Sequence, residues 1–329
     1  MKLSEIGELP LLRIIRKRFR GKTPRLVLGI GDDAAVIRPK NTNMLLTTDM
    51  MVEGVHFDLR WTTPYQLGFK LVSVNVSDIY AMGGKPEFLL INFAAGKDTD
   101  YGFFEEIFDG IENAIKTYGI SLIGGDVSSS DRITLSATVT GYSAKVLRRS
   151  SARTGNRIYV TGYLGEAACG LELMKRIKKK VKIEKGQKAK ISLKWDLALP
   201  LIQRHLMPVA RNPERFIKKA SSMIDISDGL LIDLSRICSE SGVGARIYVD
   251  RIPMSDQLKR TTEYLGISPL DLALGGGEDY ELLFTTPAKE KVNAYCIGEI
   301  VNSGMQLVDV KGKRNKVPVK GYQHFTVQR

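Results

Sequence analysis

The chain has 329 residues, 43% of them hydrophobic and 26% charged, which is long enough for two ordinary domains that each bury a core. Every apolar run is shorter than the roughly 20 residues of a membrane-spanning helix, and the basic N-terminal residues follow the apolar ones, which excludes a secretory signal. The three cysteines, Cys169, Cys238 and Cys296, form no C-x-x-C pair and predict reduced thiols in a cytoplasmic protein.

The net charge of +13 raises the question of nucleic-acid binding. Residues 175–190, which we name the basic segment, hold nine lysines and arginines against one glutamate, so they carry +8 and the rest of the chain only +5. The segment has no aromatic side chain to stack on bases, and its first lysines suit the dipole at the end of a helix. We interpret it as a solvated, mobile surface segment and expect no nucleic-acid or membrane partner, with RNA binding as the minor alternative.

In the first half of the chain, strands alternate with two helices. The helix over 63–84 opens with a Thr-Pro pair and closes on two glycines. The helix over 101–119 has an apolar stripe that begins at Phe104 and runs to Ile115. Strands are expected over 25–31, 43–50, 87–95, 120–125 and 133–143.

The second half has the same mixture. A strand over 157–162 precedes a helix that begins near Glu166, and prolines interrupt the helical segments expected over 193–208 and 212–222. A short strand leads into a helix over 228–242. Further strands are expected over 245–250, 280–286, 294–300 and 305–310. Because both halves mix helices and strands, we predict two domains of the α/β or α+β type, each with its own sheet.

The stretch LVLGIGDDAAVI, residues 26–37, fits the G-x-G-x-x-A spacing of a dinucleotide-binding loop, and Asp49 lies where that fold keeps its ribose-binding acid. The fingerprint requires a helix directly after the loop, but Pro39 follows almost at once. A parallel crossover needs about a dozen residues. We therefore predict a strand, a glycine turn and a second strand, and reject dinucleotide binding.

Acidic residues recur at strand ends beside glycines or hydroxyls, where the backbone can approach a ligand. Carboxylates that converge repel one another unless cations lie among them, and oxygen ligands favour Mg²⁺, which usually binds a few carboxylates together with substrate phosphates. The residues in this setting are Asp32, Asp33, Asp49, Asp78, Asp126, Asp225, Asp228, Glu278 and Asp279. The pattern predicts a two-domain, Mg²⁺-dependent enzyme that handles phosphate.

Structural roles compete with this interpretation at individual positions. Asp228 also suits a helix cap and Asp279 a turn, and both alternatives have equal weight. Asp78 lies late in a mostly apolar helix and needs a partner; Asn75 lies one turn earlier on the same face. The sequence has no H-x-x-x-H pair, no G-x-x-x-x-G-K-[ST] loop and no G-x-S-x-G turn, which argues against a zinc site, a P-loop and a hydrolase nucleophile.

Eight motifs follow one another across nearly the whole chain: GIGDDAAVI, TTDMMVEGVHF, NVSDIYAMGGKP, LIGGDVS, TGYLGEAACGLEL, IDISDGLLIDL, GGGEDYELLFT and KGYQHF. Together they closely resemble the thiamine-monophosphate kinases, a family of the aminoimidazole ribonucleotide synthetase-like superfamily. The resemblance implies ATP-dependent phosphorylation of thiamine monophosphate to thiamine diphosphate. It also implies an α/β (α+β) fold of two domains. Residues 1–148 would be the dimerisation and ATP/Mg-binding domain, whose mixed sheet with helices forms a barrel across a homodimer. Residues 149–329 would be an α/β sandwich domain that completes the nucleotide and substrate site.

The resemblance also implies roles for individual residues. The implied ligands of several Mg²⁺ ions are Asp33, Thr47, Thr48, Asp49, Asp78, Asp126, Asp225 and Asp228. The implied contacts to ATP are Gly125, Asp126, Arg149 and Ser227. The implied contacts to thiamine monophosphate are His56, Glu278 and Tyr322, where an aromatic ring can stack on a cationic thiazolium. The implied catalytic residues are Asp49, Asp126 and Arg149.

Some features leave alternatives open. His56 alone is also typical of an ordinary packed histidine. Asn156 stands where the family usually has Asp, so we assign it no role, and the basic segment matches no motif. A selenophosphate synthetase would carry a reactive cysteine near the N-terminus, and none precedes Cys169. An aminoimidazole ribonucleotide synthetase is the remaining alternative within the superfamily, although EGVHF and GGGEDYELLFT favour the kinases.

Overall fold

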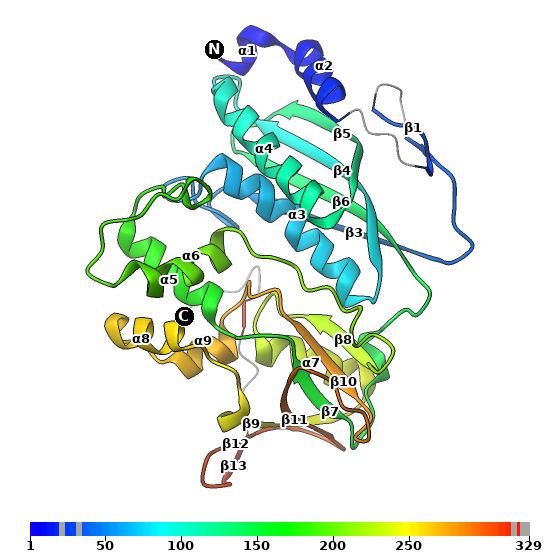
Figure 1. The fold of residues 1–329 in the computed structure, drawn as a ribbon, viewed down its shortest axis with the longest axis vertical. Coiled ribbons are helices and arrows are strands. Elements are labelled where there is room, and N and C mark those ends of the chain that lie inside the picture. Colours follow the sequence, from blue (N-terminus) through cyan, green and yellow to red (C-terminus); the bar gives the residue numbers. More distant parts are fainter. Residues whose placement is uncertain (20–23, 31–34, 317–320, 323–329) are drawn as a thin grey trace. The chain divides into compact units, whose positions relative to one another are not determined.

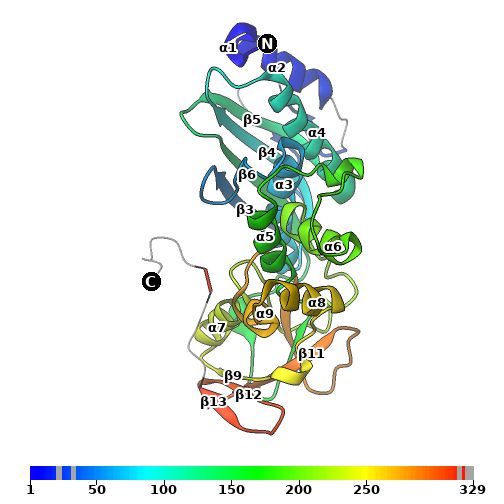
Figure 2. The same ribbon diagram turned by 90° about the vertical axis from the view of Figure 1, so that its left-hand side faces the viewer.

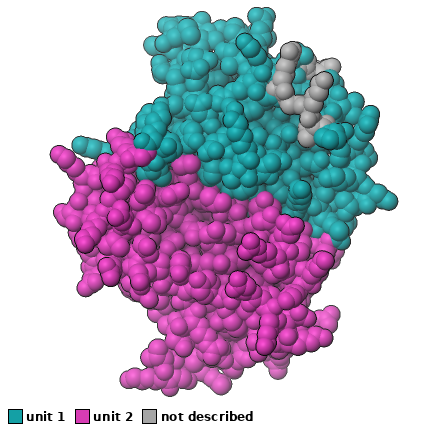
Figure 3. Space-filling model, viewed as in Figure 1, with its two compact units in different colours: residues 1–79, 84–144, 179–185 teal, residues 80–83, 145–178, 186–329 magenta. Residues whose placement is uncertain are grey.

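The computed structural model of the chain describes residues 1–19, 24–30, 35–316 and 321–322. The chain divides into two compact units, coloured separately in Figure 3, and each has its own mixed sheet with helices. This confirms the predicted fold class. The first unit comprises residues 1–79, 84–144 and 179–185, and the second comprises residues 80–83, 145–178 and 186–329.

The first unit is built on a four-stranded sheet in the order β3-β6-β4-β5, in which β4 and β5 are parallel and the other neighbours antiparallel. Figures 1 and 2 show α3 and α4 on one face of this sheet. Its elements are α1 (Leu3–Ile6), α2 (Glu8–Arg18), β1 (Leu26–Leu28), β2 (Val36–Ile37), β3 (Asn43–Val52), α3 (Pro64–Ala81), β4 (Lys85–Ala95), α4 (Tyr101–Tyr118), β5 (Ser121–Ser129), β6 (Thr134–Ser143) and the helical turn η2 (Ile183–Lys185).

The predicted strand–turn–strand over residues 26–37 is confirmed in its two strands. β1 and β2 pair antiparallel, with Leu26 opposite Ile37. The turn itself, with Asp32 and Asp33, lies outside the described residues. The dinucleotide alternative therefore lacks the parallel pairing that it requires.

Helix α4 illustrates how local sequence sets an element's ends. Asp100 caps its first turn by accepting a hydrogen bond from the Gly102 amide at 2.7 Å, and Gly119 ends it in the left-handed conformation with φ 65°. Between them the apolar stripe that includes Phe104 and Ile107 is buried. The helix predicted from this stripe is confirmed.

Helices α3 and α4 cross at two glycines without room for a side chain. A Cβ atom added to Gly68 would lie 2.1 Å from the carbonyl oxygen of Ile107, and one added to Gly110 would lie 1.9 Å from that of Tyr65. Both contacts are with backbone, so relieving them requires the helices to move apart. The close crossing holds α3, which carries Asp78, against its neighbours.

We expect Gly110→Ala to destabilise the chain. Helix propensity alone would favour alanine by about 1 kcal/mol. Overpacking against the backbone of α3 outweighs this gain, for a net loss of about 1–3 kcal/mol in the free energy of unfolding. Urea denaturation measures the change, with the exposed α4 variant Glu105→Ala as the control. A stabilised Gly110→Ala protein would contradict the close crossing.

The basic segment is not wholly solvated, and that interpretation was wrong for residues 181–184. Val181 is buried, and its carbonyl oxygen accepts a hydrogen bond from Nε2 of Gln66 at 2.7 Å. Lys182 pairs with Glu106 of α4 at 2.6 Å. Apolar residues between the lysines are buried to different extents, which a count of charges does not reveal. This part of the segment therefore packs within the first unit.

The second unit has a seven-stranded sheet in the order β13-β12-β9-β11-β7-β10-β8, antiparallel except between β12 and β9. Its elements are the helical turn η1 (Arg149–Ser151), β7 (Arg157–Val160), α5 (Glu166–Ile177), α6 (Trp195–Leu206), β8 (Ser222–Asp225), α7 (Leu230–Ser241), β9 (Gly244–Tyr248), the helical turn η3 (Val249–Arg251), α8 (Asp256–Leu265), α9 (Pro269–Gly275), β10 (Leu282–Thr286), β11 (Tyr295–Val301), β12 (Met305–Val308) and β13 (Arg314–Lys316). No helix among the described residues of the chain is both long and apolar enough to cross a membrane.

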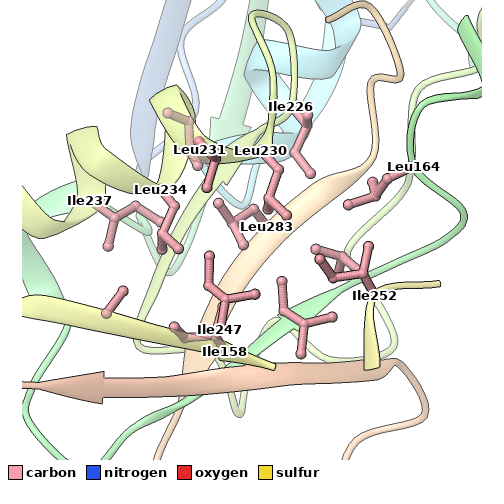
Figure 4. Close-up of a cluster of buried hydrophobic side chains, with 14 of the residues drawn as sticks. Ile158, Leu164, Ile226, Leu230, Leu231, Leu234, Ile237, Ile247, Ile252 and Leu283 are labelled. Carbon is pink, nitrogen blue, oxygen red and sulfur yellow. The ribbon is translucent and has the colours of Figure 1, made fainter. Parts of the chain in front are cut away.

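Along β7, β8 and β10, successive side chains point to opposite faces of this sheet, and both faces are buried. One face packs against the apolar side of α7, and Figure 4 shows Ile158 and Leu283 in this cluster with Leu230 and Leu234. The other face holds a second cluster that includes Phe284. Burial on both faces fixes β8 and the start of α7, between which the predicted Asp225–Asp228 motif lies.

The helix predicted over 212–222 is wrong. Residues 214–219 form successive turns, and β8 begins at Ser222. Phe216 stacks on Phe284 with ring centroids 4.2 Å apart. This tertiary contact explains why the helical pattern is overridden.

Candidate active site

Three predicted residues of the first half meet where β3 faces α3. The Thr47 hydroxyl donates to Oδ2 of Asp78 at 2.6 Å. The backbone amide of Asp49 donates to Oδ1 of Asn75 at 2.9 Å. Thr47 thus supplies a partner for the Asp78 carboxylate, and Asn75, one turn earlier in α3, contacts the backbone of β3. This places two carboxylates and a hydroxyl on one side of the sheet.

Thr48 does not share this side, although the sequence groups it with Thr47. Adjacent residues of a strand point to opposite faces. The Thr48 hydroxyl donates to the carbonyl oxygen of Ala137 at 2.9 Å, and that of Thr138 donates to Thr48 at 3.2 Å. Of these two threonines, Thr47 is the one whose hydroxyl contacts Asp78.

Asp126 lies on β5, at the opposite edge of the sheet from β3. Asp126 is paired with Asn92 on β4. Asp49 belongs to the next row of residues paired across the sheet, and that row ends at Gly125 on β5. Three strand spacings of about 4.8 Å separate the two edges by about 14 Å. Asp49 and Asp126 of one chain therefore lie at opposite edges and in rows that face opposite ways.

Gly125 is required for backbone reasons. Its φ is 149°, and a Cβ atom there would lie 1.8 Å from the carbonyl oxygen of Ile91. Only glycine fits so close to β4. The predicted ATP contact at this position therefore involves bare backbone.

In the second unit, a buried carboxylate holds the loop between β8 and α7. Oδ2 of Asp233 accepts hydrogen bonds from the three amides of residues 227–229, each at 3.1 Å. Arg236 contacts Oδ1 of Asp233 at 2.5 Å and Oδ2 of Asp228 at 2.6 Å. Burial raises the pKa of Asp233 to about 6, while Arg236 opposes that rise. The loop amides are thus occupied, so a ligand would meet the Ser227 side chain and the Asp228 carboxylate, which is 27% exposed and already paired with Arg236.

The GGGEDYELLFT motif lies against this loop. Glu278 donates its amide to the carbonyl oxygen of Ser227 at 2.8 Å. Tyr322 donates its amide to the carbonyl oxygen of Asp228 at 3.1 Å. Three segments far apart in the sequence therefore bring Ser227, Asp228, Glu278 and Tyr322 together, and Asp225 ends the adjacent strand β8.

Asp279 has a structural role, which decides between the two alternatives left open for it. It is fully buried, and its two carboxylate oxygens accept the amides of Gly165 at 2.6 Å and Ala167 at 2.9 Å. These amides lie at the start of α5, where backbone donors lack helical partners. Asp279 thus ties its loop to that helix.

The protonation of Asp279 makes stability depend on pH. Burial raises its pKa to about 7 from 3.8, although the two amide hydrogen bonds oppose the rise. The folded state therefore keeps a proton that the unfolded state releases near pH 4, and the resulting stabilisation is lost as the pH rises through about 7. We expect the free energy of unfolding, wild type minus Asp279→Asn, to fall from about pH 4 to about pH 7 and then to level off. A difference that rises with pH would contradict this assignment.

A cluster of buried ions beside this loop was not predicted. Oε1 of Glu281, which is fully buried, lies 2.7 Å from Arg204 and 2.7 Å from Arg211. Thr161 donates to Oε2 at 2.5 Å, and Arg204 also pairs with Glu166 at 3.2 Å. The acid that ends GGGEDYE and the arginines of RHLMPVAR lie some seventy residues apart, so no local pattern joins them.

The other predicted residues have the following surroundings. Nδ1 of His56 accepts the amide of Val52 at 3.1 Å, which fits a packed turn as well as a substrate contact. Arg149 is 43% exposed and lies 3.9 Å from Glu240. The Asn156 side chain accepts the amide of Arg153 at 3.1 Å and so closes the turn before β7. Asn supplies this acceptor without a charge.

The oxygen donors of the site lie in pairs, and such a pair can bind a hard cation such as Mg²⁺. In the ranges that the structure covers, no three His, Cys, Asp or Glu side chains gather around one point. Mg²⁺ commonly uses one or two carboxylates and completes its shell with water and phosphate oxygens. Asp78 beside the Thr47 hydroxyl fits that mode.

Burial raises the pKa of Cys169 to about 12 and that of Cys238 to about 11, which keeps both thiols protonated and unreactive.

The chain is similar to known proteins along nearly its whole length. Residues 31–143 match the profile of the AIR synthase related protein, N-terminal domain, and residues 153–311 match that of its C-terminal domain. The thiamine-monophosphate kinase of Aquifex aeolicus is 37% identical, over 99% of this chain and 100% of its own. That of Escherichia coli K12 is 33% identical, over 97% and 98%. A solved structure, AaThiL complexed with AMPPCP and TMP, is 35% identical, covers 99% of both chains and aligns with a TM-score of 0.75.

Proposed function

The chain belongs to the AIR synthase related proteins. We infer that it transfers the γ-phosphoryl group of ATP to thiamine monophosphate, giving thiamine diphosphate and ADP. The observation that carries the inference is the full-length similarity to AaThiL complexed with AMPPCP and TMP. Curated thiamine-monophosphate kinases match over the same length. The enzyme is a phosphotransferase whose acceptor is itself a phosphate group.

We assign the roles within the site from the family motifs and the contacts above. Residues 1–148 bind ATP and Mg²⁺ and dimerise, and residues 149–329 complete the nucleotide and substrate site. The Mg²⁺ ligands are Asp33, Thr47, Thr48, Asp49, Asp78, Asp126, Asp225 and Asp228. Gly125, Asp126, Arg149 and Ser227 bind ATP, and His56, Glu278 and Tyr322 bind thiamine monophosphate.

The chemistry requires positioning more than proton transfer. The attacking oxygen of thiamine monophosphate is already anionic at neutral pH, so the chain needs no strong general base. Arg149 has an exposed guanidinium that can neutralise charge on the transferred group, and the Ser227 hydroxyl can orient a phosphate. Mg²⁺ held by the assigned carboxylates would supply neutralisation of charge on the phosphate oxygens. The residues of this chain therefore act by orientation and electrostatics.

We propose that the first unit acts as a homodimer that closes a barrel. Both β3 and β5 are edge strands, and long edge strands expose unpaired backbone groups. On the uncovered side of β3, Met44, Leu46 and Met50 are each more than half exposed. A second copy would cover these side chains and bring an Asp126 edge towards an Asp49 edge.

The dimer proposal predicts a change of mass. Leu46→Lys places a charge in the middle of the exposed apolar row of β3, and we expect it to convert the dimer to a monomer of about half the mass in light scattering after gel filtration. Leu9→Lys, at an exposed position on α2, is the control and should remain dimeric. A wild-type chain that is monomeric, or a Leu46→Lys variant that stays dimeric, would contradict the proposal.

A cytoplasmic location is part of the same proposal. The three cysteines are free thiols, and Cys169 and Cys238 are buried. Free structural thiols are typical of reducing compartments.

The fate of the γ-phosphate tests the function against its nearest alternative. With [γ-³²P]ATP, Mg²⁺ and thiamine monophosphate, we expect the label in thiamine diphosphate. An ATP-dependent synthetase of the same superfamily would release the label as inorganic phosphate. Label found only as inorganic phosphate would therefore overturn the kinase assignment. Salt-dependent retardation of RNA, lost on replacing the exposed Lys178, Lys179 and Lys180 with alanine, would instead favour the RNA-binding alternative.

A further inference from the structure

The loop that carries Glu278 has a constrained backbone. Glu278 and Tyr280 both have positive φ, 66° and 49°, a conformation that non-glycine residues adopt only when their surroundings enforce it. The amide of Glu278 bonds to Ser227, and that of Tyr280 bonds to the carbonyl oxygen of Ile226 at 2.9 Å. Residues 278–280 are therefore held in place by main-chain contacts.

The three carboxylates of this loop differ in what they can do. Asp279 and Glu281 are fully buried, and both bind groups inside the unit. The Glu278 side chain is 30% exposed. Of the three, Glu278 is the one that can meet a ligand from solvent, which agrees with the substrate contact assigned to it.

A buried histidine lies beside this carboxylate. The His205 side chain, near the end of α6, is 8% exposed, and its Nδ1 lies 3.0 Å from Oε2 of Glu278. The backbone of α6 has little freedom here, because a Cβ atom on Gly170 of α5 would lie 2.1 Å from the carbonyl oxygen of Leu201 and 3.0 Å from Cβ of His205. The histidine is thus a fixed point against which the Glu278 side chain can be oriented.

We propose that His205 is a positioning residue that orients the Glu278 carboxylate for thiamine monophosphate, a proposal that rests on the proposed function. Nδ1 of His205 lies 3.0 Å from Oε2 of Glu278 without the alignment of a hydrogen bond, and a small turn of the carboxylate lets the Nδ1–H group donate to it. Glutamate has three rotatable side-chain bonds, and a contact to a rigid partner reduces the rotamers that binding must freeze. The role concerns the affinity for thiamine monophosphate and not the binding of ATP.

Substitutions that move or remove the donor test this role. His205→Asn keeps a donor near the position of Nδ1, His205→Gln places it near that of Nε2, and His205→Leu removes it. We expect the KM for thiamine monophosphate to rise about tenfold in the Gln and Leu variants, as for loss of a charge-assisted hydrogen bond. The Asn variant should stay within about twofold of wild type, and the KM for ATP should be unchanged throughout. Gln203→Ala, on the exposed side of α6, is the matched control.

The same substitution in a Glu278→Gln protein distinguishes positioning of residue 278 from general support of the fold. If His205 acts through Glu278, then adding His205→Gln to Glu278→Gln raises the KM for thiamine monophosphate no further. Equal KM values in the Asn and Gln variants, or an undiminished effect of His205→Gln in the Glu278→Gln background, would overturn the proposal. The comparison of Asn with Gln holds even if the Leu variant does not fold. A wild-type enzyme that fails to phosphorylate thiamine monophosphate refutes the function itself. If the wild type is active and all His205 variants keep its KM for thiamine monophosphate, only this inference is refuted.

Discussion

Replacing Asp49 by Asn is expected to abolish formation of thiamine diphosphate, with kcat lowered by on the order of 10²- to 10³-fold or more, while the fold stays intact. Asn has nearly the same shape, and the hydrogen bond from the backbone of residue 49 to Asn75 is retained. What is lost is one negative charge at a position assigned to Mg²⁺, and hard cations bind neutral amides less strongly than carboxylates. Initial rates at saturating ATP and Mg²⁺ measure the effect.

Two further variants provide a parallel test and a control for that result. Asp126→Asn should lose as much activity, because Asp126 has the same assigned role at the other edge of the sheet. Asp131→Asn removes a charge from the exposed turn between β5 and β6 and should keep wild-type rates. Turnover at the wild-type rate in Asp49→Asn, at ordinary Mg²⁺ concentrations, would refute the metal assignment.

Glu281→Ala is expected to cause the largest loss of stability. Removing this buried carboxylate leaves Arg204 and Arg211 facing one another without their shared partner. Breaking a buried ion pair from one side costs about 3–5 kcal/mol. Arg211 is 39% exposed and can turn towards water, so we expect the lower end, about 3 kcal/mol, in the free energy of unfolding measured by urea denaturation.

An exposed acid provides the comparison for Glu281. Glu263→Ala, on the surface of α8, should change the free energy of unfolding by less than about 0.5 kcal/mol. If Glu281→Ala and Glu263→Ala unfold alike, the ion cluster contributes nothing to stability.

The sequence predicted the elements whose periodicity is local. The stripe of α4 with its Asp100 and Gly119 ends, and the strand pair around residues 26–37, required no knowledge of distant contacts. The helix expected over 212–222 failed because stacking of Phe216 on a strand seventy residues away overrides local propensity. Val181 was missed for a similar reason, since one buried valine among lysines leaves the charge pattern unchanged.

The candidate site was predictable in its residue types and not in its contacts. Glycine-flanked acids indicated phosphate and Mg²⁺, but the contact of Thr47 with Asp78 depends on how β3 packs against α3. The opposite directions of Thr47 and Thr48 follow from strand geometry once the strand is known. Arg204 and His205 gave no motif signal, because their roles come from carboxylates that only the fold brings near.

A coupled assay of ADP release tests the central claim most directly. With ATP, Mg²⁺ and thiamine monophosphate, the account predicts that thiamine diphosphate and ADP form in equal amounts. Thiamine offered as the acceptor should give no product, because it lacks the anionic phosphate that attacks. Absence of thiamine diphosphate from a folded wild-type enzyme under these conditions would contradict the account.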